Sequence, residues 1–122
     1  MIMTANDTIT PASEEEAVDI IREAAGRGAT LEIAGGGTKR GYGRPVQAGA
    51  TLSLSGLNGI TLYEPSELVI AAKAGTPLSE IEARLKDHNQ RLPFEPPRLS
   101  RLTGGDPDRA SIGAVVACNL SG

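Results

Sequence analysis

The feature that most constrains the fold is a run of three glycines that directly follows a short β-prone segment. Gly35, Gly36 and Gly37 come just after residues 30–33 and are followed by the hydroxyl of Thr38. Glycines remove every Cβ from a turn, so successive backbone N–H groups can face one concavity and approach an anion closely. The pattern favours a phosphate-binding loop at the end of a strand. Glycine clusters also form plain turns, and the run by itself leaves that alternative open.

The charges beside the glycines favour the same kind of ligand. Residues 35–49 contain three cations, Lys39, Arg40 and Arg44, and no carboxylate. Two well-known phosphate motifs are nevertheless excluded. A Walker loop needs Gly-Lys-Ser/Thr at the start of a helix, whereas here Thr38 precedes Lys39 and glycines and a proline follow. The dinucleotide fingerprint meets Arg40 at its third glycine, so a Rossmann domain is not expected.

The composition excludes several classes of function. The net charge is −3 and only three residues are aromatic, so the chain has neither the basic surface nor the stacking platforms of a nucleic-acid-binding protein. A lone cysteine, Cys118, and a lone histidine, His88, give no internal disulfide and no metal-ligand spacing. Cys118 is expected to be buried among small apolar neighbours. The sequence contains no signal peptide and no membrane-spanning run, which predicts a cytoplasmic protein.

The first half of the chain predicts a helix between short strands. A capping box from Ser13 to Glu16 opens a helix over residues 14–26, which glycines end. Residues 30–33 form a strand that leads into the glycine loop. Residues 51–54 alternate in polarity, which predicts a strand with one buried face. Residues 1–10 are expected to be a disordered tail.

The second half begins with two strands and a helix. Residues 60–63 and 68–74 are apolar runs separated by Glu-Pro, and they are expected to pair in antiparallel fashion. Thr76 is the expected N-cap of the next helix, which starts at Pro77 and ends near residue 87. His88 then lies at the helix C-terminus, and an ordinary structural role is the favoured interpretation.

The last third of the chain is irregular and then apolar. Residues 92–97 contain three prolines and form a stiff segment that is neither helix nor strand. Residues 98–109 are polar and charged, which is typical of a mobile surface loop. Residues 111–122 are small and apolar, and the sequence stops abruptly there. This ending predicts that the chain is part of a larger domain.

The motifs, taken in order, resemble those of a known family. They are GGGTK at 35–39, LSLSGLNGI at 52–60, EPSELVI at 64–70, AGTPL at 74–78 and ASIGAVVACNLSG at 110–122. Residues 11–122 are similar to the N-terminal part of the FAD-binding domain of the vanillyl-alcohol oxidase and p-cresol methylhydroxylase (PCMH-type) superfamily. Within it, LPFEPP at 92–97 and VACNLSG at 116–122 most resemble the FAD-binding subunit of bacterial glycolate oxidases.

The resemblance implies a truncated PCMH-type fold of the α+β class. A small α/β subdomain with the phosphate loop is expected over residues 11–49, and part of a mixed or antiparallel sheet subdomain over residues 50–122. The substrate-binding cap domain of such enzymes has no counterpart in this sequence. As a fragment, the chain is expected to fold weakly or to self-associate.

The resemblance also implies a set of cofactor-binding residues. The glycine loop and the two residues after it would hold the FAD pyrophosphate, Pro96 would lie near the flavin, and small residues of the last motif would approach the isoalloxazine and ribityl groups. Members with covalently bound flavin often carry a histidine after the glycine loop, where this chain has Lys39 and Arg40, so FAD is expected to bind without a covalent link. The implied set is Gly35, Gly36, Gly37, Thr38, Lys39, Pro96, Ser111, Gly113, Asn119 and Gly122.

The activity implied is the oxidation of a small 2-hydroxy acid to a 2-oxo acid by a flavin-dependent oxidoreductase. The expected partners are a second flavoprotein and an iron–sulfur subunit, through which the protein would lie at the periphery of the inner membrane. No residue of this chain is nominated as a catalytic base, and the fragment alone is expected to be inactive. Two alternatives remain: a non-catalytic nucleotide- or anion-binding module, and a structural remnant without a ligand.

Overall fold

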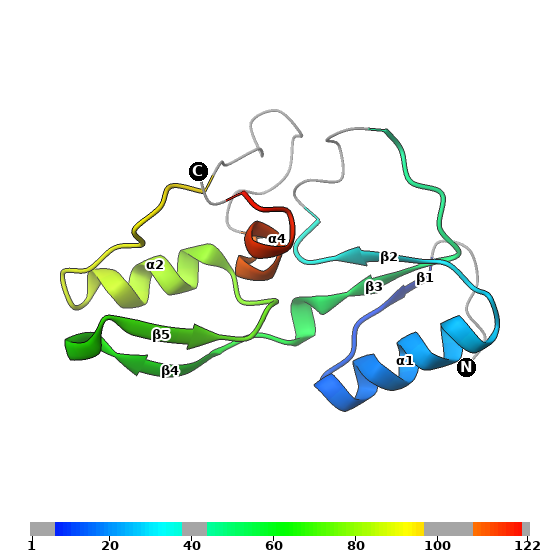
Figure 1. Ribbon diagram of the computed structural model, residues 1–122, viewed down its shortest axis with the longest axis horizontal. Helices are drawn as coiled ribbons and strands as arrows, with labels where there is room; N and C mark the ends of the chain where they lie inside the picture. The colour runs from blue at the N-terminus through cyan, green and yellow to red at the C-terminus, as the bar shows by residue number, and fades with distance from the viewer. Residues whose placement is uncertain (1–6, 38–43, 97–108, 121–122) are drawn as a thin grey trace.

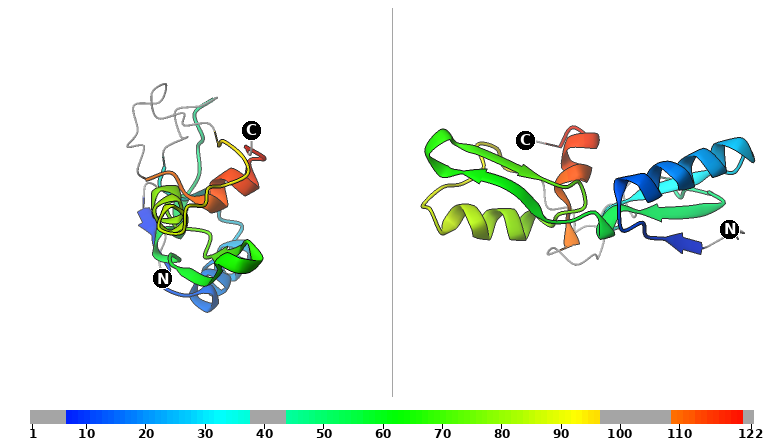
Figure 2. Two further views of the ribbon diagram at one scale, coloured as in Figure 1. Left: turned by 90° about the vertical axis from the view of Figure 1, so that its left-hand side faces the viewer. Right: turned by 90° about the horizontal axis from the view of Figure 1, so that it is seen from below.

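The computed structural model describes residues 7–37, 44–96 and 109–120. The molecule is elongated and consists of two α/β halves, each with its own sheet and one helix lying along it (Figure 1). A short third helix lies between the halves, as the views in Figure 2 also show. The expected α+β class is confirmed.

The first half is built on a three-stranded parallel sheet. Its strands are β1 (Asp7–Ile9), β2 (Leu31–Ala34) and β3 (Ala50–Ser53), in the order β1-β3-β2. All four residues of β3 are buried, so the expectation of one buried face was wrong. A central parallel strand is covered on both faces, and hydroxyls can be buried there when they are satisfied. The hydroxyl of Thr51 donates to the Glu32 carboxylate at 3.3 Å.

Two predicted boundaries change in this half. Residues 7–9 are not part of a disordered tail: they form β1, which pairs in parallel with β3. A three-residue strand carries too little pattern to be seen in the sequence, and its partner lies far along the chain. Because β3 belongs to the first sheet, the division between the two halves falls after Ser53 and not at residue 49.

Helix α1 (Glu14–Gly26) forms where it was predicted. The Ser13 hydroxyl accepts from the backbone N–H of Glu16 at 3.2 Å, and the Glu16 carboxylate accepts from the N–H of Ala12 at 2.8 Å. At the other end Gly28 has φ +65° and forms a Schellman turn. The residues that face the sheet are Ala17, Ile20 and Ala24, all buried.

The second half is an antiparallel hairpin with a helix along it (Figure 1). Strand β4 (Ile60–Glu64) pairs with β5 (Val69–Ala72), as expected. A single 3-10 turn, η2 (Pro65–Glu67), connects the strands and ends at Leu68, which has φ +57°. Helix α2 (Leu78–Lys86) follows, and its buried residues are Leu78, Ile81 and Leu85.

Thr76 does not cap α2, which corrects the sequence-based expectation. The position before the helix is Pro77, which offers no side-chain cap. The hydroxyl of Thr76 is fully buried and accepts from the N–H of Gly59 at 2.9 Å. It also lies 3.2 Å from the Gly59 carbonyl oxygen, to which it donates. Thr76 therefore ties the end of β5 to the turn that precedes β4.

The C-terminal apolar run contains the short helix α4 (Ile112–Ala117), to which the sequence analysis assigned no element. The Ser111 hydroxyl caps it by accepting from the N–H of Ala114 at 3.4 Å. Cys118 follows the last turn and is exposed, so the expectation that it is buried was wrong. The core between α2 and α4 consists of Leu78, Ala110 and Val115, with Leu92, Phe94, Ile112 and Leu120 packed against it.

Candidate functional site

The carboxyl ends of the parallel strands meet at one edge of the first sheet. Ala34 and Ser53 are paired neighbours at the ends of β2 and β3. The glycine loop continues from β2, and the 3-10 turn η1 (Leu54–Gly56) continues from β3. Open α/β sheets place ligands at this edge. The glycine loop thus lies beside η1, in the region where the two halves of the molecule join.

Two of the three glycines make room for another part of the chain. A Cβ built on Gly35 would overlap the side-chain oxygen of Ser111, and one on Gly36 would overlap the main-chain carbonyl of Arg109. Gly37 is different, because it has φ +74°, which favours glycine on conformational grounds. Gly36 therefore packs against the main chain of Arg109 and Gly35 against the side chain of Ser111, and both contacts leave no room for a Cβ.

The segment that follows Arg109 is held from its other side by the residues between β5 and α2. The N–H of Leu78 donates to the Ala110 carbonyl at 2.8 Å, and the N–H of Ile112 donates to the Thr76 carbonyl at 3.0 Å. The N–H of Gly113 donates to the Ala74 carbonyl oxygen at 2.8 Å. A Cβ built on Gly113 would lie 2.6 Å from that oxygen. Residues 109–113 are thus fixed between the glycine loop and the start of α2.

A small hollow opens at this junction. Its volume is about 120 Å³, and its lining contains one cation and no carboxylate. The Asn58 side chain donates to the Ser55 carbonyl at 2.8 Å, and the Ser55 hydroxyl lies 2.9 Å from that of Ser53. The lining residues are Gly36, Ser55, Asn58, Gly75, Pro77 and Arg109. Glycine, hydroxyl, amide and guanidinium groups match the donors that phosphate prefers, so the residues present fit a phosphate group of FAD.

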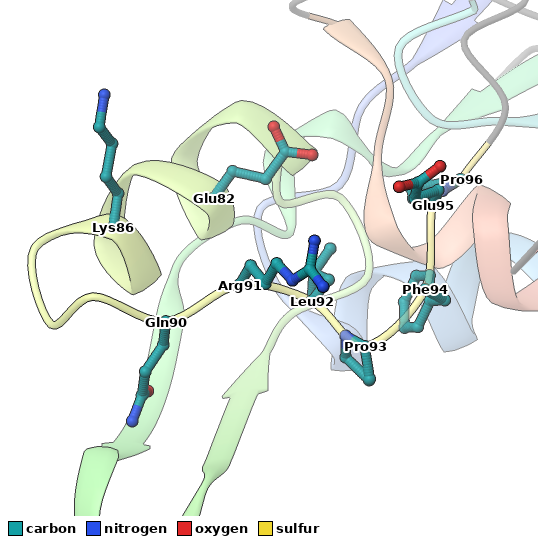
Figure 3. Close-up of a pocket in the computed structure, with 9 residues that line it drawn as sticks. All are labelled: Glu82, Lys86, Gln90, Arg91, Leu92, Pro93, Phe94, Glu95 and Pro96. Atoms are coloured by element: carbon teal, nitrogen blue, oxygen red, sulfur yellow. The ribbon is translucent and has the colours of Figure 1, made fainter.

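A larger hollow of about 590 Å³ lies between α2 and the proline-rich segment (Figure 3). Figure 3 shows residues 90–96 running past the exposed side of α2, with Glu95 and Pro96 at the far end. Its polar lining is of mixed charge, because Lys86 and Arg91 are accompanied by Glu82 and Glu95. This hollow has no charge preference for an anion.

The structure brings together only some of the predicted site residues. Gly35, Gly36, Ser111 and Gly113 belong to one packed unit. Pro96 lines the larger hollow, and Asn119, with φ +54°, follows the end of α4. Thr38, Lys39 and Gly122 lie outside the described residues, as does most of the expected surface loop at 98–109.

Sequence reasoning missed the three side chains that line the small hollow. Arg109 was placed in a surface loop, and neither Ser55 nor Asn58 was given a role. Ser55 follows the β-prone run 51–54, Asn58 precedes β4 and Arg109 precedes the last motif, and only the fold brings these positions together.

The described part of the chain was also searched for metal-binding clusters and for membrane-spanning helices. No group of three or more His, Cys, Asp or Glu side chains there is arranged to hold a metal ion. None of the helices described is long and apolar enough to span a membrane.

Comparison with known proteins provides independent information on the same residues. Residues 6–122 match the model of a family described as an FAD binding domain. Over 92 residues the chain is 45% identical to the glycolate oxidase subunit GlcE of Escherichia coli (strain K12), covering 75% of this chain and 24% of that protein. It is 27% identical over 97 residues to an FAD-linked oxidoreductase from Mycobacterium tuberculosis (strain ATCC 25618 / H37Rv), covering 79% of this chain and 21% of that one. The chain spans about a quarter of the length of these curated relatives.

Proposed function

The chain belongs to the family of FAD-binding domains, and from that membership we propose that it is the FAD-binding part of a glycolate-oxidase-like enzyme subunit. FAD is thereby confirmed as the cofactor, and neither a cofactor-free remnant nor a general anion-binding module is favoured. The observation that carries the proposal is the close packing of Gly35 and Gly36 against Ser111 and Arg109, because it joins the glycine loop to the last motif, and both motifs are expected to bind FAD.

The proposed binding mode assigns different parts of FAD to different residues. Gly35–Gly37 with Thr38 and Lys39 hold the pyrophosphate through backbone N–H groups and side chains. The Ser111 side chain lies against Gly35 of the same loop, and Gly113 packs against Ala74; both residues are proposed to lie near the flavin. The assignments of Pro96, Asn119 and Gly122 rest on the family resemblance.

FAD is proposed to bind without a covalent link. Lys39 and Arg40 occupy the positions where covalently flavinylated relatives often carry histidine. The single histidine of the sequence, His88, follows α2 and packs edge-to-face against Tyr63, with ring centroids 5.0 Å apart. Its ring nitrogen Nδ1 lies 3.4 Å from the Arg84 carbonyl oxygen. These contacts support a structural role for His88.

The proposed reaction is the oxidation of a small 2-hydroxy acid to the 2-oxo acid. Bound FAD supplies the hydride acceptor for such a reaction, while the protein supplies binding and orientation. The residues of this chain bind the cofactor, and none is proposed as a catalytic base. We propose a complex with a second flavoprotein and an iron–sulfur subunit, because the Escherichia coli relative is a subunit of a glycolate oxidase. We also propose that the protein is cytoplasmic and lies at the periphery of the membrane through those partners.

A titration of the chain with FAD tests the proposal. The parent chain is expected to bind FAD saturably, with quenching of flavin fluorescence and a rise in Tm. Gly36→Ala should weaken binding at least about fivefold, because its methyl group would displace Arg109. Overpacking of this kind costs about 1–3 kcal/mol, or roughly five- to 150-fold in affinity where it falls on the bound state.

Gly26→Ala is the matched control, because nothing lies within 4 Å of a Cβ built at that position. It should bind FAD as the parent does. Acid treatment that releases all flavin would support non-covalent binding. Absence of saturable FAD binding by the parent chain would overturn the proposal.

A further inference from the structure

Arg109 is exposed, and its main chain is fixed by contacts with neighbouring segments. Its carbonyl oxygen lies against Gly36, and a Cβ built on that glycine would lie 2.9 Å from the Cβ of Arg109. The next residue, Ala110, is 7% exposed and accepts from the N–H of Leu78 at 2.8 Å. Ser111 is 2% exposed and forms an isolated antiparallel β-bridge with Pro77. The main chain that carries the guanidinium is therefore held by both halves of the molecule.

The surroundings of Arg109 favour a bound anion. It is the one charged residue of the six that line the small hollow. In the part of the chain that the structure describes, its guanidinium forms no ion pair. The lining of the larger hollow, in contrast, contains two carboxylates as well as two cations.

The small hollow is large enough for a phosphate group, since its volume is about 120 Å³. A planar guanidinium fork presents paired donors to phosphate oxygens, and lysine does not reproduce this geometry.

Building on the proposed function, we propose that Arg109 binds a phosphate group of FAD in this hollow. Residues 109–113 then contribute a cation to the cofactor site, in addition to the surface against which the glycine loop packs. The diphosphate is held from two sides: by the glycine loop that follows β2, and by Arg109, which precedes α4.

The test compares ligands with the parent chain and three variants. Arg109→Gln should weaken FAD and ADP binding by the same factor, about ten- to a hundredfold, because a hydrogen bond to a charged group is lost. Arg109→Lys should recover only part of that loss. The control is Arg22→Gln, an exposed arginine on α1, which should bind FAD and ADP as the parent does. The Tm without ligand should be the same for all four proteins, whereas a purely structural role of Arg109 would lower it.

Equal FAD affinity in parent and Arg109→Gln would overturn the inference and leave the proposed function standing. A lowered Tm of both Arg109 variants without ligand would also overturn it. If the parent binds no FAD, the proposed function fails, and inorganic pyrophosphate then decides the subsite separately. A rise in Tm with pyrophosphate in the parent and not in Arg109→Gln would support the anion site, and no rise in either would overturn it.

Discussion

Thr76 shows how one hydroxyl can join two parts of the chain that are distant in sequence. It is 0% exposed, and its Oγ1 bonds to both the N–H and the carbonyl of Gly59, 17 residues earlier. Its own backbone carbonyl accepts from Ile112 at 3.0 Å. A buried polar group is tolerated only when it is hydrogen-bonded. The position therefore requires a hydroxyl because of its hydrogen bonds to Gly59, and not because a helix cap is needed for α2.

Replacement of this hydroxyl should be costly. Thr76→Val keeps the shape of the side chain and leaves the Gly59 N–H without its partner, while the Gly59 carbonyl still accepts from the N–H of Lys73 at 3.0 Å. The substitution should therefore destabilise the chain by about 1–3 kcal/mol. Thr76→Ser keeps the hydroxyl and should cost less than about 1.5 kcal/mol, mainly for the lost methyl group. Urea unfolding followed by circular dichroism measures both values. Equal stability of Thr76→Val and the parent would contradict this account of Thr76.

At the scale of the elements, local signals were sufficient for some structures and insufficient for others. The capping box of α1 and the Glu-Pro break after β4 act between residues close in sequence, so both elements were predicted correctly. Strand β1 and the full burial of β3 depend on pairing between residues 7–9 and 50–52, which no local pattern reveals. Helix α4 is only six residues long and is rich in small and β-branched residues, so its sequence does not favour a helix.

The candidate site likewise combines a feature that is visible locally in the sequence with contacts that are not. The glycine loop was recognisable because glycine at three successive positions is a local signal. The partners of Gly35 and Gly36 were not, because Ser111 and Arg109 lie more than 70 positions away in the printed sequence. The small hollow combines residues from four separate stretches of chain, and the fold alone brings them together.

The N-terminal cap of α1 gives a prediction at this scale. Ser13→Ala removes the acceptor for the Glu16 N–H, and N-cap losses of this kind cost about 1 kcal/mol, with a range of about 0.5–2. Ser13→Asp should restore most of the stability, because aspartate also caps and suits the positive end of the helix dipole. Thermal unfolding of the three proteins provides the measurement. A Ser13→Asp variant as unstable as Ser13→Ala would contradict the capping role.

The whole molecule exposes apolar side chains on the outer face of the β4–β5 hairpin. Leu62 pairs with Ala71 across the strands, and Val69 lies on the same face; Leu62 is 47% and Val69 44% exposed. Tyr63, on the opposite face, contacts α2 through the Arg84 guanidinium, 6.0 Å from its ring centroid. A two-stranded sheet also has two edges with unpaired backbone groups, which are templates for pairing with another chain.

We therefore expect the chain to self-associate as its concentration rises. Replacing both Leu62 and Val69 by lysine should lower the apparent mass at high concentration, because charges on a strand face oppose pairing. Val46→Lys is the control, since Val46 is 66% exposed and lies outside the hairpin. Sedimentation velocity at several concentrations measures the effect. A monomeric parent chain, or equal association of all three proteins, would contradict this expectation.

The parallel pairing of β1 with β3 has a consequence for synthesis on the ribosome. Asp7 finds its partner only at Ala50, and Ile9 only at Leu52. Chains emerge from the amino terminus at about 5–20 residues per second, so the first strand must wait several seconds for its partner. During that interval α1 can form its local hydrogen bonds, but the sheet that its apolar face will cover is still incomplete. We therefore expect the apolar residues of the nascent first half to remain accessible to chaperones until residues 50–53 have left the exit tunnel.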